Sequence, residues 1–449
     1  MNGLLFRLEH LLLARRAVPI LLLIFLLPRI GVLFFHVAPT SDAGWYFNQA
    51  MGLARGVGYA EGGVPTAYWP PGYPLALSLI FKIFSPSLLA AQLFNIACAV
   101  ASAWLVLDLG RQAFSSEVTG RAALFLLAIY PNSIGYIPLL FTETFYTALL
   151  LGGCWIIVVC RGLKRLFLAG VLFGIATLVK AQSLVVIPMI FLVSVLREQA
   201  ESRNYKKMVM EIALTIVFAA FIVFPWSYRN HQVFGEWIAV STNGGMTLLS
   251  GNNPSARGDY TPDDPLVTSI PRTVATQVEV DREAKRRAIN WITSNPEKFI
   301  GLIPLKIFRL WAPDGESEWF WQRGFKAYDR YEFWFRVVRV VNQVYYVALI
   351  VGFLIAGYLL FSGWLKVPKS KIDWWALPYF VALFPTAIAV VFSGQSRFHF
   401  PIMPFIMMVN GWLIFAENSP LRSRMIHSNN LVGHAKFKSA RNADEKHRP

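Results

Sequence analysis

Charged residues and cysteines are scarce in this chain of 449 residues. Asp, Glu, Lys and Arg make up 15% of it, whereas soluble domains average about 25%. Hydrophobic residues make up 55%. The three cysteines, Cys98, Cys154 and Cys160, lie in apolar segments without the spacing of metal ligands or of a disulfide framework. These shortages argue against a soluble globular protein and a disulfide-rich secreted domain, and they indicate a protein with many membrane spans.

Several motifs of soluble chemistry are also missing. The sequence contains no GxGxxG, no GxxxxGK[ST] and no cluster of His and Cys, so ATP-driven work, a soluble nucleotide sugar and a metal centre have no support. No Asn-x-Ser/Thr sequon occurs, which favours a bacterial inner (cytoplasmic) membrane over the endoplasmic reticulum. Internal repeats and low-complexity runs are absent as well.

Long apolar runs supply the predicted spans, because about 20 apolar residues cross about 30 Å of hydrocarbon. The first run, 17–36, lacks a small-residue cleavage site after it, so we interpret it as a retained span and not a signal peptide. With basic clusters as cytoplasmic markers, we predict an all-α polytopic protein with ten spans and both termini in the cytoplasm. The predicted spans are 17–36, 87–107, 122–140, 144–160, 166–179, 182–196, 209–228, 337–362, 374–392 and 400–416.

The domain organisation follows from this topology. Residues 1–416 form one predicted transmembrane domain with outer loops 37–86 and 229–336, and 417–449 form a basic cytoplasmic tail. The net charge of +16 fits the positive-inside rule and contact with anionic lipid better than nucleic-acid binding. Stretch 166–196 makes one long span or two short ones, and we predict two because one crossing would put basic clusters on opposite faces.

Ionisable residues gather at the outer turns of the predicted spans. Such residues cost about 2.5–3.5 kcal/mol each at a helix centre and usually face a cavity. Alone, each has a simpler explanation: a lysine or arginine that reaches the interface, a carboxylate that favours a helix start, or a solvated loop residue. Their joint occurrence on one face predicts one polar site. The residues are Asp42, Glu143, Lys180, Arg229, Arg397 and His399.

The second outer loop contains turn-forming and interfacial segments. The stretch "VFGEWIAVSTNGGMTLLSGNNPSARGDY" is rich in Gly, Asn and Ser, and its amides suit hydrogen bonds to a polar headgroup or sugar. Residues 281–310 predict two helices with a break at Asn295-Pro296. The aromatic and arginine-rich segment "SEWFWQRGFKAYDRYEFWFRVVR" that follows is typical of the bilayer interface.

Several motifs, in this order and at these topological positions, resemble the membrane glycosyltransferases of the GT-C superfamily. They are an acidic residue in the first outer loop, "PPGYP" before the next helix, "PWSYRN" leading into "STNGGMTLLSGNNP", "NPEKFIGLIPLKIFRLW", and "SRFHFPIMPF" before the last span. The chain from about 17 to 416 is similar to bacterial members of the group of protein O-mannosyltransferases and lipid A aminoarabinose transferases. The resemblance implies the GT-C fold and transfer of a sugar from a polyprenyl-phosphate carrier to an acceptor outside the cytoplasm.

The resemblance also implies roles for residues. The family's acidic residue in the first outer loop corresponds to Asp42, and its second acid, at the outer start of a helix, corresponds to Glu143. A hydroxyl acceptor needs a carboxylate base, which assigns Asp42 that role, with inversion at the anomeric carbon; Glu143 orients the acceptor or supports Asp42. Cations stabilise charge on a leaving phosphate, and the candidates are Lys180, Arg229 and Arg397. The candidate substrate contacts are Trp45, Tyr46, Trp69, Tyr73, Asn252 and His399.

The sequence departs from the family at two points. Ala43 follows Asp42 where many relatives have a second acid, and Tyr68-Trp69 precede Pro-Pro where aminoarabinose transferases have Glu-Lys. This chain therefore lacks a metal ligand and a phosphate-binding lysine that those relatives have. We expect that it binds no metal and does not use the substrate of the aminoarabinose transferases. A bound divalent metal is the open alternative. A lipid-linked glycan polymerase or ligase, and a transporter or flippase of lipid-linked sugar, are the rival functions. The sugar is not identified, and lipid, glycan and protein remain candidate acceptors.

Overall fold

The protein is almost entirely helical, as predicted. Within the described residues, the only strands are two residues long each and form one antiparallel hairpin in the first outer loop. They are β1 (Ala60–Glu61) and β2 (Val64–Pro65). The computed structural model describes residues 2–198, 202–362 and 374–415. The predicted tail 417–449 lies outside these ranges.

Seven helical segments are long and apolar enough to cross a membrane, and each coincides with a predicted span. They are α2 (Ala17–Gly31) with η1 (Val32–Phe34), α5 (Leu88–Phe114), α8 (Thr142–Val159), α9 (Gly162–Val179), α11 (Tyr205–Phe234), η4 (Asp329–Tyr331) with α17 (Glu332–Phe361), and η5 (Ser396–Ile402) with α19 (Met403–Phe415). A short helix, α1 (Asn2–Leu13), precedes them. The chain is therefore a multi-pass membrane protein.

Three shorter apolar segments accompany these spans. They are α4 (Gly72–Phe84), η2 (Ala181–Val185) with α10 (Val186–Leu196), and α18 (Leu377–Val391). The last two coincide with predicted spans, whereas α4 lies in the predicted first outer loop and is too short to be recognised as a span from its length. The number of crossings and the cytoplasmic position of the termini stay predictions.

One predicted span, 122–140, is not a continuous helix. Its residues belong to α6 (Glu117–Ala128) and α7 (Pro131–Gly135). Pro131 has no N–H to donate to the carbonyl of Leu127, so the helix ends before it. Arg29 of α2, which is 1% exposed, replaces the missing donors: its Nη2 donates to the Leu127 carbonyl at 3.0 Å and its Nη1 to that of Ala128 at 3.1 Å. A buried arginine thus satisfies the backbone of a broken helix.

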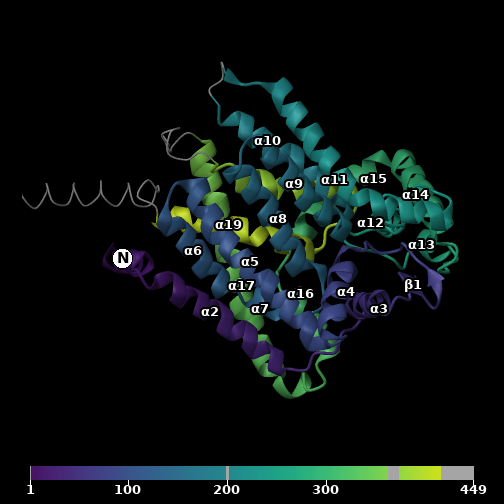
Figure 1. Cartoon of the computed structure of the whole chain (residues 1–449), viewed down its shortest axis with the longest axis horizontal. Helices are drawn as coiled ribbons and strands as arrows, with labels where there is room; N and C mark the ends of the chain where they lie inside the picture. The colour runs from purple at the N-terminus through teal and green to yellow at the C-terminus, as the bar shows by residue number, and fades with distance from the viewer. Residues whose placement is uncertain (1, 199–201, 363–373, 416–449) are drawn as a thin grey trace, which may run out of the picture.

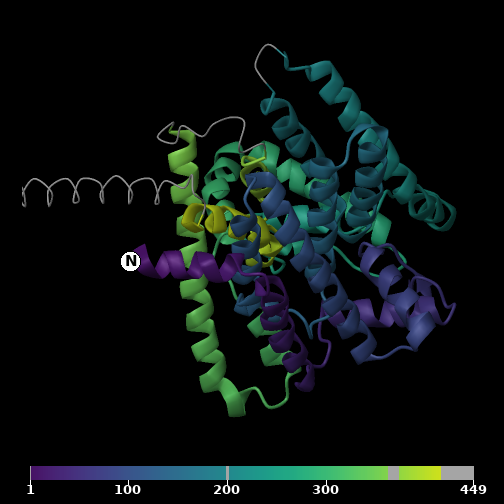
Figure 2. The same cartoon turned by 60° about the vertical axis from the view of Figure 1, so that its left-hand side comes forward.

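The other side of this break is held by α17. Tyr345 Oη donates to the Leu126 carbonyl at 2.6 Å, and Asn342 Oδ1 accepts from the Asn132 N–H at 3.1 Å. Figure 2 shows α17 along one edge of the molecule. These bonds fix α7 between α2 and α17 and so position the residues that follow it.

The stretch 166–196 forms two helices, as predicted, with a turn at Lys180. The backbone there is extended (φ −138°, ψ 108°), which ends α9. Ser183 Oγ lies 3.1 Å from the Ala176 carbonyl and 2.5 Å from the Lys180 carbonyl, which also accept from the N–H groups of Lys180 and Ser183, so the hydroxyl reinforces the turn.

Helices α9 and α11 pack closely through glycines. A Cβ at Gly170 would lie 2.8 Å from the carbonyl oxygen of Thr215, and one at Gly174 would lie 2.8 Å from that of Ala219. Small residues at helix contacts let the two backbones approach, as is common in membranes. This contact holds the end of α9, and hence Lys180, against the rest of the bundle.

Most of the two predicted outer loops lies on one side of the molecule, at the right in Figure 1. The first loop contains α3 (Asp42–Ala54), the hairpin and α4. The second contains α12 (Gly244–Gly251), α13 (Pro265–Thr268), α14 (Gln277–Ser294), α15 (Pro296–Leu310) and α16 (Glu316–Gly324), with the predicted break at Asn295-Pro296. Gln277 joins the loops because its Oε1 accepts from the Ala67 N–H at 2.8 Å.

We predict that Arg29→Met destabilises the protein. The substitution keeps the apolar stem but removes the donors of two buried carbonyls, each worth about 1–3 kcal/mol when left unsatisfied. The melting temperature of the detergent-solubilised variant should fall by several degrees. Arg15→Met, which removes an exposed arginine, is the matched control, and equal melting temperatures of the two variants would contradict the assignment.

Candidate active site

Four charged residues from four separate elements meet at one site. Asp42 is the first residue of α3, and Glu143 lies in the first turn of α8. Both carboxylates therefore sit at helix N-termini, where the helix dipole favours negative charge. Lys180 lies at the turn after α9, and Arg397 lies in η5 before α19.

The four residues form two ion pairs. Arg397 Nη1 lies 3.3 Å from Asp42 Oδ2, and Lys180 Nζ lies 3.2 Å from Glu143 Oε1. The side chains of Asp42 and Arg397 are 22% and 20% exposed, whereas that of Glu143 is 2% exposed. The first pair is accessible to a ligand, and the second has a buried carboxylate.

The remaining carboxylate oxygens also have partners. Ser41 Oγ lies 3.4 Å from Asp42 Oδ1, and Thr142 Oγ1 lies 3.3 Å from Glu143 Oε2. Lys180 Nζ lies 5.3 Å from the centre of the Phe398 ring, next to Arg397 in the chain. This cation–π contact brings η5 against Lys180 and links the two ion pairs.

A third carboxylate, Glu316, borders the site and was not predicted from the sequence. It is the first residue of α16, and its Oε2 accepts from Ser396 Oγ at 2.5 Å, directly before Arg397. The signal that could have identified it is the acidic residue after Asp314-Gly315, at the start of a predicted interfacial helix. Nothing local shows that this helix start faces η5.

His399 anchors the η5 turn inside the protein. Its Nδ1 donates to the Leu310 carbonyl at 2.7 Å, its Nε2 lies 3.2 Å from Asp314 Oδ1, and its ring stacks on Trp311 at 4°. The His399 side chain is fully buried. It was predicted to contact substrate; this position instead places it behind Arg397 as a support for the turn.

Asp314 is the centre of that anchor. Its carboxylate accepts from Tyr130 Oη at 2.5 Å, from Asn132 Nδ2 at 2.5 Å and from Asn342 Nδ2 at 3.1 Å. A buried carboxylate with this many donors is well compensated for the loss of water. The network connects α7 and α17 to η5.

Arg229, predicted to bind phosphate, is not brought into the cluster. Its Nη1 donates to the Thr66 carbonyl at 2.9 Å, and its Nη2 donates to the Tyr59 carbonyl at 3.0 Å. Its guanidinium also lies over the Trp226 ring. Arg229 ties the hairpin segment of the first outer loop to α11.

Asn252, predicted to contact substrate, also holds the fold together. Its Oδ1 accepts from Lys306 Nζ at 2.7 Å, and its Nδ2 donates to the Val391 carbonyl at 2.9 Å, at the end of α18. Burial lowers the pKa of Lys306 to about 8. These contacts fix α15 and α12 against α18.

Four aromatic residues predicted to bind substrate form one cluster beside Asp42. Trp45 lies edge-to-face on Tyr46 and Trp69, and Tyr46 contacts Tyr73 in the same way. Tyr46 and Tyr73 are buried, and Trp45 and Trp69 are partly exposed. Burial, together with the charge of Asp42, raises the pKa of Tyr46. The two tryptophans are the members that a ligand can reach.

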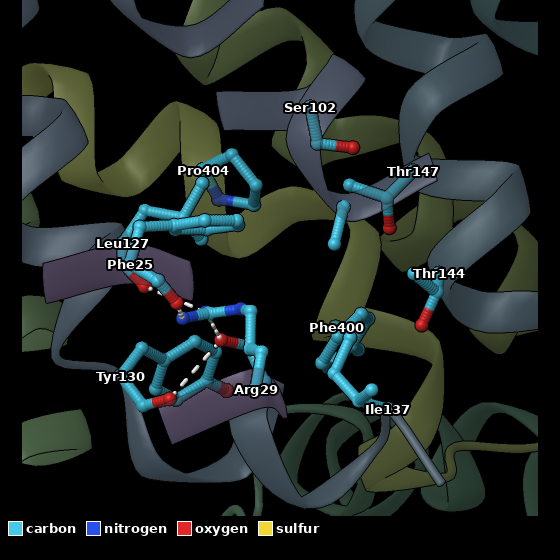
Figure 3. A pocket seen from close by; sticks show the side chains of 12 residues that line it. Phe25, Arg29, Ser102, Leu127, Tyr130, Ile137, Thr144, Thr147, Phe400 and Pro404 are labelled. Atoms are coloured by element: carbon cyan, nitrogen blue, oxygen red, sulfur yellow. Dashed lines mark hydrogen bonds between the residues drawn. The ribbon is translucent and has the colours of Figure 1, made fainter. Parts of the chain in front are cut away.

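A small cavity lies next to Arg29, and Figure 3 shows Arg29 on one side and the hydroxyls of Ser102, Thr144 and Thr147 on the other. Its volume is about 30 Å³. A space of this size holds one water molecule, not a sugar ring. We therefore place the candidate active site at the ion pairs and not at this cavity.

Among the described residues, no group of three or more His, Cys, Asp or Glu side chains could hold a metal ion. Asp42 Oδ2 is paired with Arg397 instead.

Comparisons with known proteins agree with this fold. Residues 69–227 match the family model of dolichyl-phosphate-mannose-protein mannosyltransferases. The oligosaccharyltransferase AglB of Archaeoglobus fulgidus, in complex with an inhibitory peptide and a dolichol-phosphate, has a TM-score of 0.51 and 12% identity over 89% of this chain and 50% of its own. The apo form of that enzyme gives 0.51 and 10%, over 91% and 52%.

A third solved structure is ArnT from Cupriavidus metallidurans bound to undecaprenyl phosphate, with a TM-score of 0.44 and 12% identity over 89% of this chain and 78% of its own. No curated protein matches the sequence. The chain spans about half the length of AglB. By the match over residues 69–227 and the fold that it shares with AglB, this chain is similar to membrane glycosyltransferases of the GT-C superfamily.

Proposed function

We propose that this protein transfers a sugar from a polyprenyl-phosphate carrier to an acceptor hydroxyl on the outer face of a bacterial inner membrane. The observation that carries the proposal is the meeting of Asp42, Glu143, Lys180 and Arg397, which come from four elements, beside partly exposed tryptophans. Acids and cations in one cluster suit a reaction in which a proton is taken up at one atom and negative charge develops at another.

A relative with the same fold supports the donor class. AglB was crystallised with a dolichol-phosphate and an inhibitory peptide. Because this chain spans about half of AglB and shares 12% identity with it, the donor and the acceptor are our proposal for this chain. A hydroxyl of a lipid, a glycan or a protein fits the role of acceptor.

In the proposed mechanism, the acceptor oxygen attacks the anomeric carbon on the face opposite the phosphate. The new bond forms between these two atoms while the bond from the anomeric carbon to the phosphate oxygen breaks. Asp42 takes the proton of the acceptor hydroxyl, and the bond electrons leave with polyprenyl phosphate. The configuration of the anomeric carbon is inverted.

The cations have a separate role at the leaving group. Arg397 presents a planar guanidinium that matches phosphate geometry, and Lys180 provides a point charge. Both lie in a partly dry environment, where fixed charges stabilise developing negative charge more strongly than in water. Glu143, whose side chain is 2% exposed, acts as a positioning residue for Lys180.

Asp42→Asn should abolish transfer while expression and membrane insertion stay normal. Loss of a general base costs about 10²–10⁴-fold in rate, so turnover of a lipid-linked donor should fall by that factor. Glu236→Gln, which neutralises an exposed carboxylate elsewhere on the outer face, is the charge-matched control. Near-normal turnover of Asp42→Asn would remove the assignment of the base.

Lys180→Met should weaken binding of polyprenyl phosphate by roughly tenfold or more, because one charge-assisted hydrogen bond is worth about 1.5–3 kcal/mol. The single substitution leaves Glu143 as a buried, unpaired carboxylate, which destabilises the fold. The double variant Lys180→Met with Glu143→Gln removes both charges and separates the two effects. If the stable double variant binds the lipid phosphate as the wild type does, Lys180 has no part in phosphate binding.

Both outer loops should be labelled from outside the cell. In a variant without Cys98, Cys154 and Cys160, single cysteines at Val57 and Lys298 should react with an impermeant thiol reagent in intact spheroplasts. A cysteine at Arg16, next to the basic cluster before the first span, should react only after permeabilisation. Labelling of Val57 and Lys298 from opposite sides would contradict the common site.

A further inference from the structure

The cations proposed to bind phosphate are already occupied in this structure by the carboxylates of the site. Arg397 donates to Asp42, and Lys180 donates to Glu143. Every oxygen of these two carboxylates has a hydrogen-bond partner. In this state, a guanidinium engages Asp42 Oδ2, so an acceptor hydroxyl competes with Arg397 for this oxygen.

The two pairs differ in how easily a ligand can break them. The side chains of Asp42 and Arg397 are 22% and 20% exposed, so a phosphate can approach them. The pair is held by a single contact at 3.3 Å, and the Nε of Arg397 donates to Gln395 Oε1 of its own turn. Glu143 is deeply buried, and its Oε1 stays on Lys180.

A phosphate offers the guanidinium a better partner than this carboxylate does. It presents several oxygens in the geometry of a two-point contact, whereas Asp42 provides one oxygen to one nitrogen. The His399–Asp314 anchor fixes the backbone of η5, so the exchange needs only a movement of the side chains.

We propose that the donor phosphate displaces Asp42 from Arg397, so that donor binding releases the base for the acceptor. This inference rests on the proposed function, and it adds an order of events: the donor binds first, and the acceptor hydroxyl is engaged second. Without the donor, the opposite charges of Asp42 and Arg397 neutralise each other.

The decisive experiment measures the affinity of the purified protein for undecaprenyl phosphate in detergent. If Asp42 competes with phosphate for Arg397, then Asp42→Asn, which removes the competitor, should bind the lipid phosphate more tightly than the wild type. We expect a gain on the order of tenfold, which corresponds to 1.4 kcal/mol. If Asp42 did not compete with phosphate for Arg397, Asp42→Asn would bind undecaprenyl phosphate with the affinity of the wild type.

Three controls make the result specific. Glu236→Gln carries the same change of charge at an exposed pair far along the chain and should bind as the wild type does. Undecaprenol, which lacks the phosphate, should show no difference among the variants. Asp42→Ala, which removes the carboxylate without introducing the amide of Asn, should bind undecaprenyl phosphate at least as tightly as Asp42→Asn.

A double-mutant cycle tests whether the effect passes through Arg397. In the Arg397→Gln background, Asp42→Asn should no longer increase the affinity. Unchanged or weaker binding by Asp42→Asn, or an equal gain without Arg397, would overturn the displacement. These outcomes are distinguishable from failure of the proposed function, which would show as normal sugar transfer by Asp42→Asn.

Discussion

Polar groups in this protein must find their partners inside the chain, because hydrocarbon offers none. Arg29 shows the constraint at its simplest, since the donors that Pro131 lacks come from a helix about 100 positions away in the sequence. The same requirement pairs each charge of the site. A buried charge without a partner would cost several kcal/mol. The helices must therefore pack so that each buried charge reaches its partner.

The η5 turn contains residues that satisfy this constraint and also border the candidate site. Its consecutive residues make contacts in different directions: Ser396 to Glu316, Arg397 to Asp42, and His399 to Asp314. The last contact is buried and has both ring nitrogens engaged, whereas the first two border an accessible region. Because the buried contact of His399 anchors the turn, the guanidinium of Arg397 would lose little conformational entropy if a ligand bound to it.

The balance of charge explains why this cluster of charged residues is stable in the free protein. Asp42 and Glu143 each lie in the first turn of a helix and are each paired with one cation, so both the helix dipole and the ion pair favour their charges. A ligand that brings its own negative charge can replace a carboxylate without leaving a cation alone. Stability of the free protein and the proposed binding of an anion therefore depend on the same two cations.

The amino-acid sequence alone predicted the membrane class, the spans that are long enough, the helical break at Asn295-Pro296, and one polar site with Asp42, Glu143, Lys180 and Arg397 among its members. These features depend on local properties: the apolarity of about 20 neighbouring residues, the missing N–H of proline, and the alternation of spans. Only the tertiary structure decided that Arg29 and Tyr345 complete the backbone at the break before Pro131, that Glu316 joins the site, and that Arg229 and His399 support the fold around it. Each of these depends on partners many residues away in the sequence, such as Tyr59 and Asp314, and a hydrogen bond is formed by neighbours in space, which the order of residues does not specify.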